Sequence, residues 1–231
     1  MSSAEDDEAA PARPGPATGS PPRRRLPPAE RLPQIREAAF AEFAASGYAA
    51  ASMGRVAQRA GVAKSLLYHY FPGGKADLFK DAVHSVMQPV FEDAERLIAG
   101  FEGPRLALLE RLIDHAYTVM VDDAREAVVT KLLIAEGERF PELGAFYRAE
   151  VMPRSLTLLR QVLQDGVSRR EFRPEAAAWL PQLLVAPAVL ASTWRLAFGR
   201  QEPLDVAALR RGHMEMLSHG LLAAPPRPAP G

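Results

Sequence analysis

The stretch Ser52–Phe71, SMGRVAQRAGVAKSLLYHYF, decides the fold of this chain of 231 residues. Apolar residues recur there at helical spacing in two runs, and Ser52 precedes the first run as a favourable N-cap. Gly61 separates the runs and can adopt the left-handed backbone that a sharp turn requires. Pro72 and the two glycines after it end the second run. The apolar residues are Met53, Val56, Ala57 and Ala60 in the first run and Val62, Leu66 or Leu67, and Phe71 in the second, where we favour Leu67 as the inward residue. The stretch therefore predicts two short helices joined by a tight turn.

The second of these helices carries polar and aromatic side chains that a core does not need. Tyr68, His69 and Tyr70 are consecutive, so they cannot all point inward. Lys64 and Ser65 open the same helix. A helix-turn-helix presents its second helix to the major groove of DNA. The alternative is an ordinary helical hairpin with aromatic residues in its core. We favour the first interpretation and predict a DNA-binding regulator.

A wider pattern of spaced residues supports this prediction. It reads Phe40-x-x-Phe43-x-x-x-Gly47-Tyr48, then Ser52-x-x-x-Val56-Ala57-x-x-Ala60-Gly61-Val62-x-Lys64-x-x-Leu67-Tyr68-His69-Tyr70-Phe71, then Lys75-x-x-Leu78. Over about residues 30–85 the chain resembles the TetR family of bacterial repressors. The resemblance implies an all-helical homodimer with an N-terminal DNA-binding domain and a C-terminal domain for ligand and dimer contacts. It also implies repression that a small molecule relieves.

The same resemblance assigns DNA contacts to individual positions. The expected contacts are Ser52, Arg55, Lys64, Ser65, Leu66, Tyr68, His69, Tyr70 and Lys75. Lys64 and Ser65 should reach base edges, and Leu66 should pack against a thymine methyl group. The others should bond phosphates or, for Tyr68, a phosphate or a base. For each of them the alternative is a solvated surface side chain. Ala63 departs from the family pattern, because Ser or Thr usually caps this helix.

The charge distribution favours DNA binding, although the formal net charge is zero. Residues 23–80 carry ten lysines or arginines against four acids, whereas residues 81–231 carry seventeen against twenty. Positive charge is therefore concentrated around the predicted helix-turn-helix, as a phosphate backbone requires. The neutral total disfavours the alternative of a sequence-indifferent nucleic-acid-packaging protein.

Composition along the chain, together with what the resemblance implies, predicts four regions. These are a disordered Pro/Ala-rich arm at 1–29, a helix-turn-helix DNA-binding domain at 30–78, a helical ligand-binding and dimerisation domain at 79–222, and a disordered tail at 223–231. Arg23–Arg25 ends the arm, either as a minor-groove contact or as a solvated basic tail. The N-terminus lacks the apolar core of a signal peptide, so we expect a cytoplasmic protein.

Helical periodicity dominates the rest of the chain and predicts an all-α fold. We expect helices at about 30–46, 75–99 with a kink at Pro89, 104–121, 124–138, 142–169, 174–198 and 204–222. The apolar stretch 179–198 is long enough to suggest a membrane span, but Gln182, Arg195 and two prolines argue against one. A helix that is apolar nearly all round must be covered on several sides. Such a stretch lies either at the centre of the domain or at a subunit interface. In the proteins that the chain resembles, the last two long helices form the dimer interface, and the resemblance therefore implies a homodimer interface at about 174–222.

An effector pocket should lie between the helices at about 85–180 and be mainly apolar. Candidate contacts by composition are His115, Tyr117, Met120, Glu136, Phe140, Phe146 and Trp179. Each of them has the alternative of a core or surface role. The apolar bias favours a hydrophobic or amphipathic ligand, and the helix at 75–99 joins both domains and is the expected lever.

An enzyme is the rival class, and its usual motifs are missing. The sequence contains no HExxH, no GxSxG, no phosphate-binding glycine loop and no cysteine. We therefore expect no catalytic residue, no metal site and no cofactor. The sequence does not distinguish a repressor from an activator, and it names neither the effector nor the operator.

Overall fold

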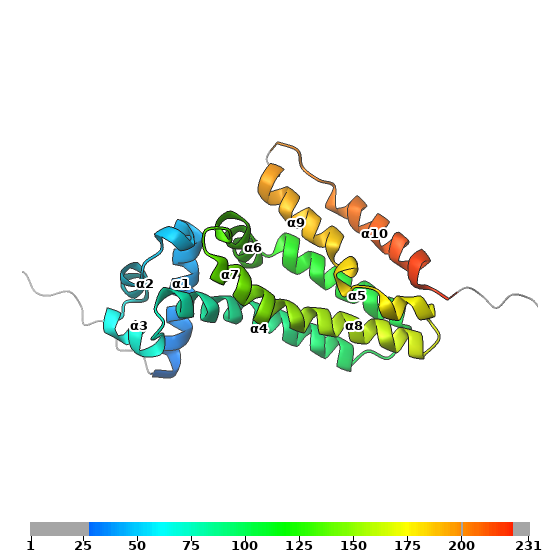
Figure 1. Cartoon of the computed structure of the whole chain (residues 1–231), viewed down its shortest axis with the longest axis horizontal. Helices are drawn as coiled ribbons and strands as arrows, with labels where there is room; N and C mark the ends of the chain where they lie inside the picture. The colour runs from blue at the N-terminus through cyan, green and yellow to red at the C-terminus, as the bar shows by residue number, and fades with distance from the viewer. Residues whose placement is uncertain (1–27, 200, 224–231) are drawn as a thin grey trace, which may run out of the picture.

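The computed structural model describes residues 28–199 and 201–223, and side chains from Arg31 onward (Figure 1). All regular elements in this part of the chain are helices, which confirms the all-α prediction. The α-helices are α1 (Pro28–Ala50), α2 (Met53–Ala60), α3 (Lys64–Tyr70), α4 (Lys75–Ala99), α5 (Arg105–Tyr117), α6 (Ala124–Glu136), α7 (Pro141–Phe146), α8 (Met152–Ser168), α9 (Ala186–Phe198) and α10 (Val206–Leu221). Two π-helical turns, η1 (Thr118–Asp122) and η2 (Tyr147–Val151), and two 3₁₀ turns, η3 (Pro174–Ala178) and η4 (Pro181–Leu184), connect some of them. The predicted arm, Arg23–Arg25 and nearly all of the predicted tail lie outside the described residues.

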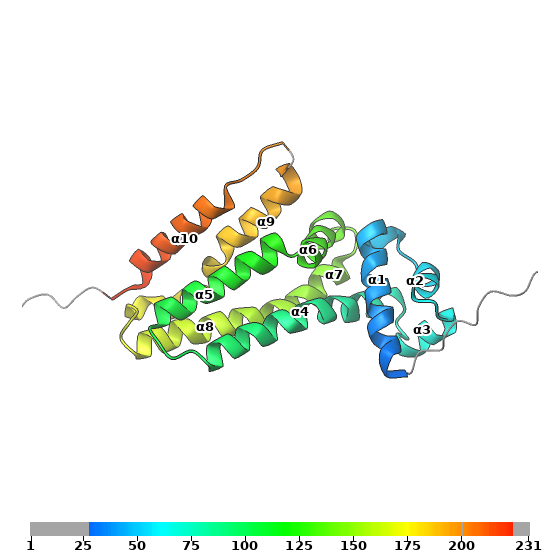
Figure 2. The ribbon, with the colours of Figure 1, turned by 180° about the vertical axis from the view of Figure 1, so that it is seen from behind.

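The helices form two groups that α4 joins. The first three helices lie at one end of the molecule, and α4 runs from them along α8 into the larger group (Figures 1 and 2). The antiparallel pair α9 and α10 covers one side of α5. α4 continues as one helix through Pro89, whose side chain is exposed.

The described residues form two hydrophobic cores. The first core contains Phe43, Leu67 and Phe79, and it also takes in Leu132 of α6 and Phe146 of α7. The second core is built by α5, α8, α9, α10 and the turns near them. The segment from α6 to η2 adds residues to the first core and also contacts α8 and α9.

The end of α1 shows why Gly47 stands in the sequence pattern. Gly47 has φ 72° and ψ 170°, which interrupts the helix and lets the chain turn toward α2. This φ favours glycine. A Cβ at Gly47 would also lie 2.5 Å from Oε1 of Glu136, so no side chain fits there unless Glu136 moves.

One predicted element is wrong. The expected continuous helix at 174–198 consists of η3, η4 and α9, with two extended residues between η3 and η4 and a turn at Val185 before α9. Pro181 and Pro187 each begin a new helical segment, because proline lacks the N–H that an uninterrupted helix needs. In the part of the chain that the structure describes, no helix is long and apolar enough to cross a membrane.

Candidate functional site: a helix-turn-helix surface and an apolar cavity

The turn between α2 and α3 has the geometry that its sequence predicts. The hydroxyl oxygen of Ser52 accepts a hydrogen bond from the backbone N–H of Arg55 at 3.3 Å. Gly61 ends α2 with φ 65° and ψ 28°, in the left-handed region. Ala63 begins α3 without any side-chain cap. A helix of this length is held by tertiary packing rather than by its own propensity.

The buried side of α3 fixes which residues face outward. Leu67 is 0% exposed and anchors the helix in the first core. Tyr68 is 46% exposed, and His69 is exposed as well. Tyr70 is partly buried against the first core. The tyrosine rings of α3 are therefore not the centre of a helical hairpin, as the alternative interpretation required.

The start of α3 forms the rest of this surface. Lys64 and Ser65 are exposed, and Leu66 is half-buried. The Nζ atom of Lys64 lies 5.8 Å from the centre of the Tyr68 ring, which is cation–π range. A cation, a hydroxyl group and a phenol thus share one exposed face of α3, the combination that base-edge and phosphate contacts use.

Two of the expected DNA contacts have structural partners instead. The guanidinium of Arg55 pairs with Glu42 and donates to the carbonyl oxygen of Ala50. Lys75 donates through Nζ to the carbonyl oxygens of Tyr48, at 2.8 Å, and Ala49, at 3.2 Å. In this conformation both cations hold the end of α1, and neither extends freely toward a phosphate.

Glu42 is a buried acid that sequence reasoning missed. It is 1% exposed and pairs with Arg55 and with Arg59, whose Nη2 lies 3.4 Å from Oε2 of Glu42. Burial alone would raise the pKa of Glu42, but the hydrogen bonds and charge of Arg55 and the bond from Arg59 outweigh it and lower the pKa. Glu42 therefore fixes α2 against α1. Its spacing in sequence carries no signal that separates it from a solvated glutamate.

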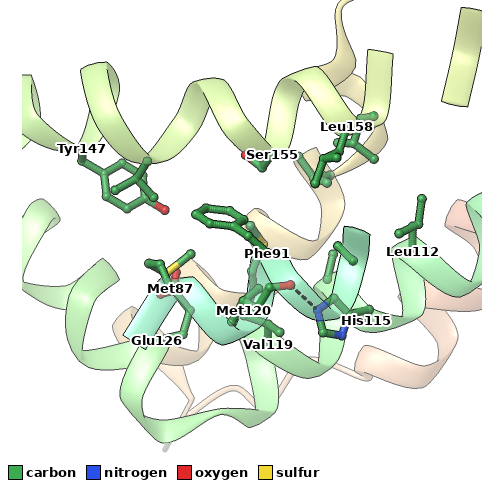
Figure 3. A pocket seen from close by; sticks show the side chains of 16 residues that line it. Met87, Phe91, Leu112, His115, Val119, Met120, Glu126, Tyr147, Ser155 and Leu158 are labelled. Atoms are coloured by element: carbon green, nitrogen blue, oxygen red, sulfur yellow. Dashed lines mark hydrogen bonds between the residues drawn. The ribbon is translucent and has the colours of Figure 1, made fainter. Parts of the chain in front are cut away.

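The second site is a pair of neighbouring cavities in the larger group of helices, and Figure 3 shows the inner one. The inner cavity, of about 110 Å³, lies between α4, α5, η2 and α8. The outer cavity, of about 450 Å³, lies between α6, α8 and α9. Both linings include Met120, Glu126, Tyr147, Ser155 and Val185. The two cavities therefore meet along a common wall, and most of their remaining lining is apolar.

One polar group at this wall, the carboxyl of Glu126, is deeply buried, and Tyr147 and Ser155 are partly buried. Glu126 is 2% exposed; its Oε1 accepts from the hydroxyl of Thr130 at 3.2 Å, and its Oε2 has no hydrogen-bond partner. Burial raises the pKa of Glu126 to about 7, although the hydrogen bond from Thr130 lowers the pKa in part. Burial, and then the charge of Glu126, also raise the pKa of Tyr147, whose hydroxyl points into the cavity (Figure 3).

Of the expected ligand contacts, only His115 and Met120 line this site. The Nε2 atom of His115 lies 3.3 Å from the carbonyl oxygen of Val90, a bond drawn in Figure 3. Tyr117 is buried in the second core, with its hydroxyl 3.4 Å from Nδ1 of His213. Trp179 packs against Arg173, whose guanidinium carbon lies 5.4 Å from the centre of the Trp179 ring.

The remaining three expected contacts join the two groups of helices. Phe140 packs edge-on against Tyr48 at 5.0 Å between ring centres, and Phe146 packs against Phe79 at 6.4 Å. The carboxylate of Glu136 accepts the backbone N–H groups of Tyr48 and Ala49, each at 2.6 Å. These residues connect α6 and α7 to the DNA-binding end and line neither of the two cavities.

Sequence reasoning missed Glu126 and Tyr147, the polar groups at the common wall. A glutamate in the first turn of a helix normally interacts with the helix N-terminus and stays solvated. Only the packing of η2, α8 and α9 over α6 encloses it. Within the described ranges, no group of three acidic, histidine or cysteine side chains is arranged to hold a metal ion.

An apolar face remains uncovered on the last two helices. Leu190 and Phe198 of α9 are 51% and 47% exposed, and Met216 of α10 is 72% exposed. Gly212 of α10 has nothing within 4 Å of the position of a Cβ, so another backbone can approach closely there. This face coincides with the predicted dimerisation region.

Comparison with known proteins agrees with this geometry. The sequence model described as "Bacterial regulatory proteins, tetR family" matches residues 35–82, which span α2, α3, most of α1 and the start of α4. The chain is also similar to the fatty acid metabolism regulator protein of Bacillus subtilis (strain 168), with 24% identity over 193 residues that cover 81% of this chain and 94% of that protein.

Solved structures share the complete architecture. The transcriptional regulator FadR from Bacillus subtilis, solved in complex with stearoyl-CoA, superposes with a TM-score of 0.66 at 22% identity, over 82% of this chain and 98% of that one. A regulator from Saccharomonospora viridis in complex with choline has a TM-score of 0.67 at 19% identity, over 85% and 100%. The matched DNA-binding segment, the related regulator and the common helical fold together support a TetR-family transcriptional regulator.

Proposed function

We propose that this chain is a homodimeric repressor that binds a palindromic operator and is released by a small hydrophobic molecule. The observation that carries the proposal is the position of α6. Near its start, α6 lines both cavities through Glu126, and at its end it holds the DNA-binding group through Glu136. One rigid helix therefore touches the site for a ligand and the site for DNA.

The exposed side of α3 supplies the DNA-reading surface. Lys64 and Ser65 lie at its N-terminal end, which in this motif reaches base edges, and Tyr68 lies one turn further on. His69 and Tyr70 are suited to phosphates, which fix the register without reading the sequence. Arg55 and Lys75 contribute by holding the end of α1, and each can reach a phosphate only by exchanging its present partners.

The exposed apolar face supports assembly with a second copy. Leu183, Leu190 and Phe198 stay uncovered within one chain, and Met216 lies on the neighbouring helix. Exposed apolar patches of this kind mark interaction surfaces. A twofold pairing through α9 and α10 places two α3 helices on one side of the dimer. Both α3 helices can then bind only if the distance between them matches half-sites about 34–36 Å apart.

The cavities support a hydrophobic effector. Their apolar lining and partial enclosure are typical of small-molecule sites. The relative from Bacillus subtilis is named as a regulator of fatty acid metabolism, and its structural counterpart was solved with stearoyl-CoA. Another structural neighbour was solved with choline, so the shared fold does not by itself name the ligand.

The route from ligand to DNA runs through α6 and α4. Glu126 and Glu136 are ten residues apart on α6, or about 15 Å along a helix. The carboxylate of Glu136 holds the backbone of Tyr48 and Ala49 from one side, while Lys75 of α4 holds the same two residues from the other. A ligand that favours another position of α6 must therefore shift the end of α1 and the spacing of the two α3 helices.

The proposed role is regulatory, without catalysis, and in the cytoplasm. Its test is a gel-shift titration of the full-length protein against a palindrome from the promoter next to its own gene and against random DNA of equal length. We expect tighter binding to the palindrome and a steep loss of affinity with added salt. Equal affinity for both DNAs would favour the alternative of a sequence-indifferent nucleic-acid-binding protein and would overturn the repressor. Gene expression with and without the regulator distinguishes a repressor from an activator.

A further inference from the structure

The two cavities contain polar atoms that the protein itself does not satisfy. Oε2 of Glu126 and the hydroxyl oxygen of Ser192 are both buried without a hydrogen-bond partner. Both residues line the outer cavity, and Glu126 also lines the inner one. Buried polar groups in folded proteins are nearly always hydrogen-bonded, so two exceptions in one cavity indicate that a ligand completes them.

The charges around Glu126 determine which ligand group fits. Among the described residues, no arginine or lysine lines either cavity; the titratable residues there are Glu126, Tyr147 and His115. His115 is engaged with the carbonyl oxygen of Val90. Asp123, at the N-cap of the same helix, adds negative charge near Glu126 and raises its pKa further. A ligand carboxylate or phosphate would meet like charge here, whereas a protonated amine would be attracted.

We propose that the two cavities bind an apolar molecule that carries one protonated primary amine, with the ammonium group donating to Glu126 and Ser192. The apolar part of the ligand lies among Met87, Phe91 and Leu159 in the inner cavity. An ammonium group has three donors, which is enough for the free oxygen of Glu126, the oxygen of Ser192 and one further acceptor. Charge-assisted hydrogen bonds in an enclosed apolar site are stronger than neutral ones.

This assignment rests on the proposed function only in identifying the ligand as the effector; the site itself can be tested without DNA. The full-length protein is titrated by calorimetry at about pH 8 with octylamine, octan-1-ol, octanoate and octanoyl-CoA. At this pH the carboxyl group of Glu126 is mostly ionised and a primary amine is protonated. We expect octylamine to bind most tightly and octanoate most weakly.

Substitutions at the wall shared by the two cavities then test which side chain causes the preference for octylamine. Glu126→Gln should weaken octylamine binding by about tenfold or more, with octan-1-ol binding unchanged, which also shows that the cavity is still folded. Ser192→Ala should weaken octylamine by a smaller factor. Glu138→Gln removes one carboxylate from an exposed position outside the cavities, so it should leave all four affinities unchanged.

Three results overturn the proposal. Octanoate or octanoyl-CoA binds more tightly than octylamine, or the amine preference survives in Glu126→Gln, or none of the four probes binds. Gel shifts with octylamine keep the two hypotheses apart. Glu126-dependent amine binding without release of operator DNA contradicts the repressor mechanism and leaves the amine site standing. Specific operator binding with no amine binding contradicts the amine site alone.

Discussion

At the scale of single residues, Lys64 and Tyr68 have the most direct access to a DNA groove. Both are exposed on α3, and the fully buried Leu67 holds the helix in place beneath them. We predict that Lys64→Ala and Tyr68→Ala each weaken operator binding by roughly 1–3 kcal/mol if a base contact is lost. Gel-shift titrations measure this. As a control, Lys131→Ala removes an exposed lysine from α6 and should leave the affinity unchanged. If neither Lys64→Ala nor Tyr68→Ala changes the affinity, another surface of the protein contacts the DNA bases.

Ala63 offers a residue whose replacement should add stability. It occupies the N-cap of α3 with φ −70° and ψ 140°, and the helix has no side-chain cap. Ala63→Ser supplies an acceptor for the first backbone N–H groups, so we predict a gain of about 1 kcal/mol in the free energy of unfolding by urea. Ala145→Ser, inside α7, should instead lose a few tenths of a kcal/mol because serine has a lower helix propensity. A gain at both positions would exclude capping as the cause.

Glu126 should make stability depend on pH in a direction opposite to that of most acids. Its pKa is raised by burial to about 7, so the folded state keeps a proton that the unfolded state releases near pH 4.5. Stability is therefore highest below pH 4.5 with respect to this group and falls as the pH rises to about 7. The neighbouring titratable groups are Asp123, Tyr147 and His115; the cavity residues from α4, α8 and α9 are uncharged.

Replacing the carboxyl group of Glu126 tests this dependence of stability on pH. We predict that Glu126→Gln stabilises the protein more at about pH 8 than at about pH 5, and therefore raises the thermal midpoint more at the higher pH. The gain in unfolding free energy at the two pH values should differ by an amount on the order of 1–3 kcal/mol. Differential scanning calorimetry at the two pH values checks this, with Glu138→Gln as the exposed control. An equal effect at both pH values would mean that Glu126 ionises normally in the folded protein.

At the scale of elements, α6 is the connection between the cavities and the DNA-binding end. Its last residue, Glu136, accepts two backbone N–H groups just after Gly47, where the backbone turns and no Cβ fits. Hydrogen bonds to a charged acceptor contribute about 1.5–3 kcal/mol each at most, so their loss should loosen this joint without unfolding the protein.

Substitution of Glu136 tests the connection. We predict that Glu136→Ala speeds hydrogen exchange of the amides at Tyr48 and Ala49 and reduces the effect of an effector on operator affinity, while ligand binding itself is retained. Hydrogen-exchange mass spectrometry and gel shifts with ligand measure the two effects. Glu138→Ala, two residues further on and exposed, is the matched control. An unchanged ligand response in Glu136→Ala would assign the coupling to α4 alone.

At the scale of the whole molecule, the exposed apolar face of α9 and α10 is the proposed dimer interface. We predict that Leu190→Glu shifts the protein from dimer to monomer in sedimentation velocity at micromolar concentration, because a charge in a dry interface is not compensated. Operator affinity should fall with it, since two half-sites must bind together. Gln161→Glu adds the same charge to the exposed side of α8 and should remain dimeric. A wild-type protein that is monomeric under these conditions would contradict the interface.

The sequence alone was sufficient for the helix-turn-helix. Its signals are local: Ser52 caps α2, Gly61 takes the left-handed turn, and Leu67 marks the buried side of α3. Each depends on residues within one or two turns, so periodicity and backbone preference predict them correctly. The break of the helix predicted at 174–198 was also encoded locally, in Pro181 and Pro187, but the strong apolar content of that stretch concealed it.

Only the tertiary structure revealed the candidate ligand site and its connection to the helices of the helix-turn-helix. Glu126 and Glu136 look alike in sequence, yet one is enclosed by η2, α8 and α9 while the other binds backbone of α1 nearly ninety residues away. The same holds for Arg55 and Lys75, whose partners lie on other elements. Local sequence determines which side of a helix is buried. The packing of the helices determines which distant groups bury its side chains or pair with them. This packing therefore sets the charge of each group and the partners that it can contact.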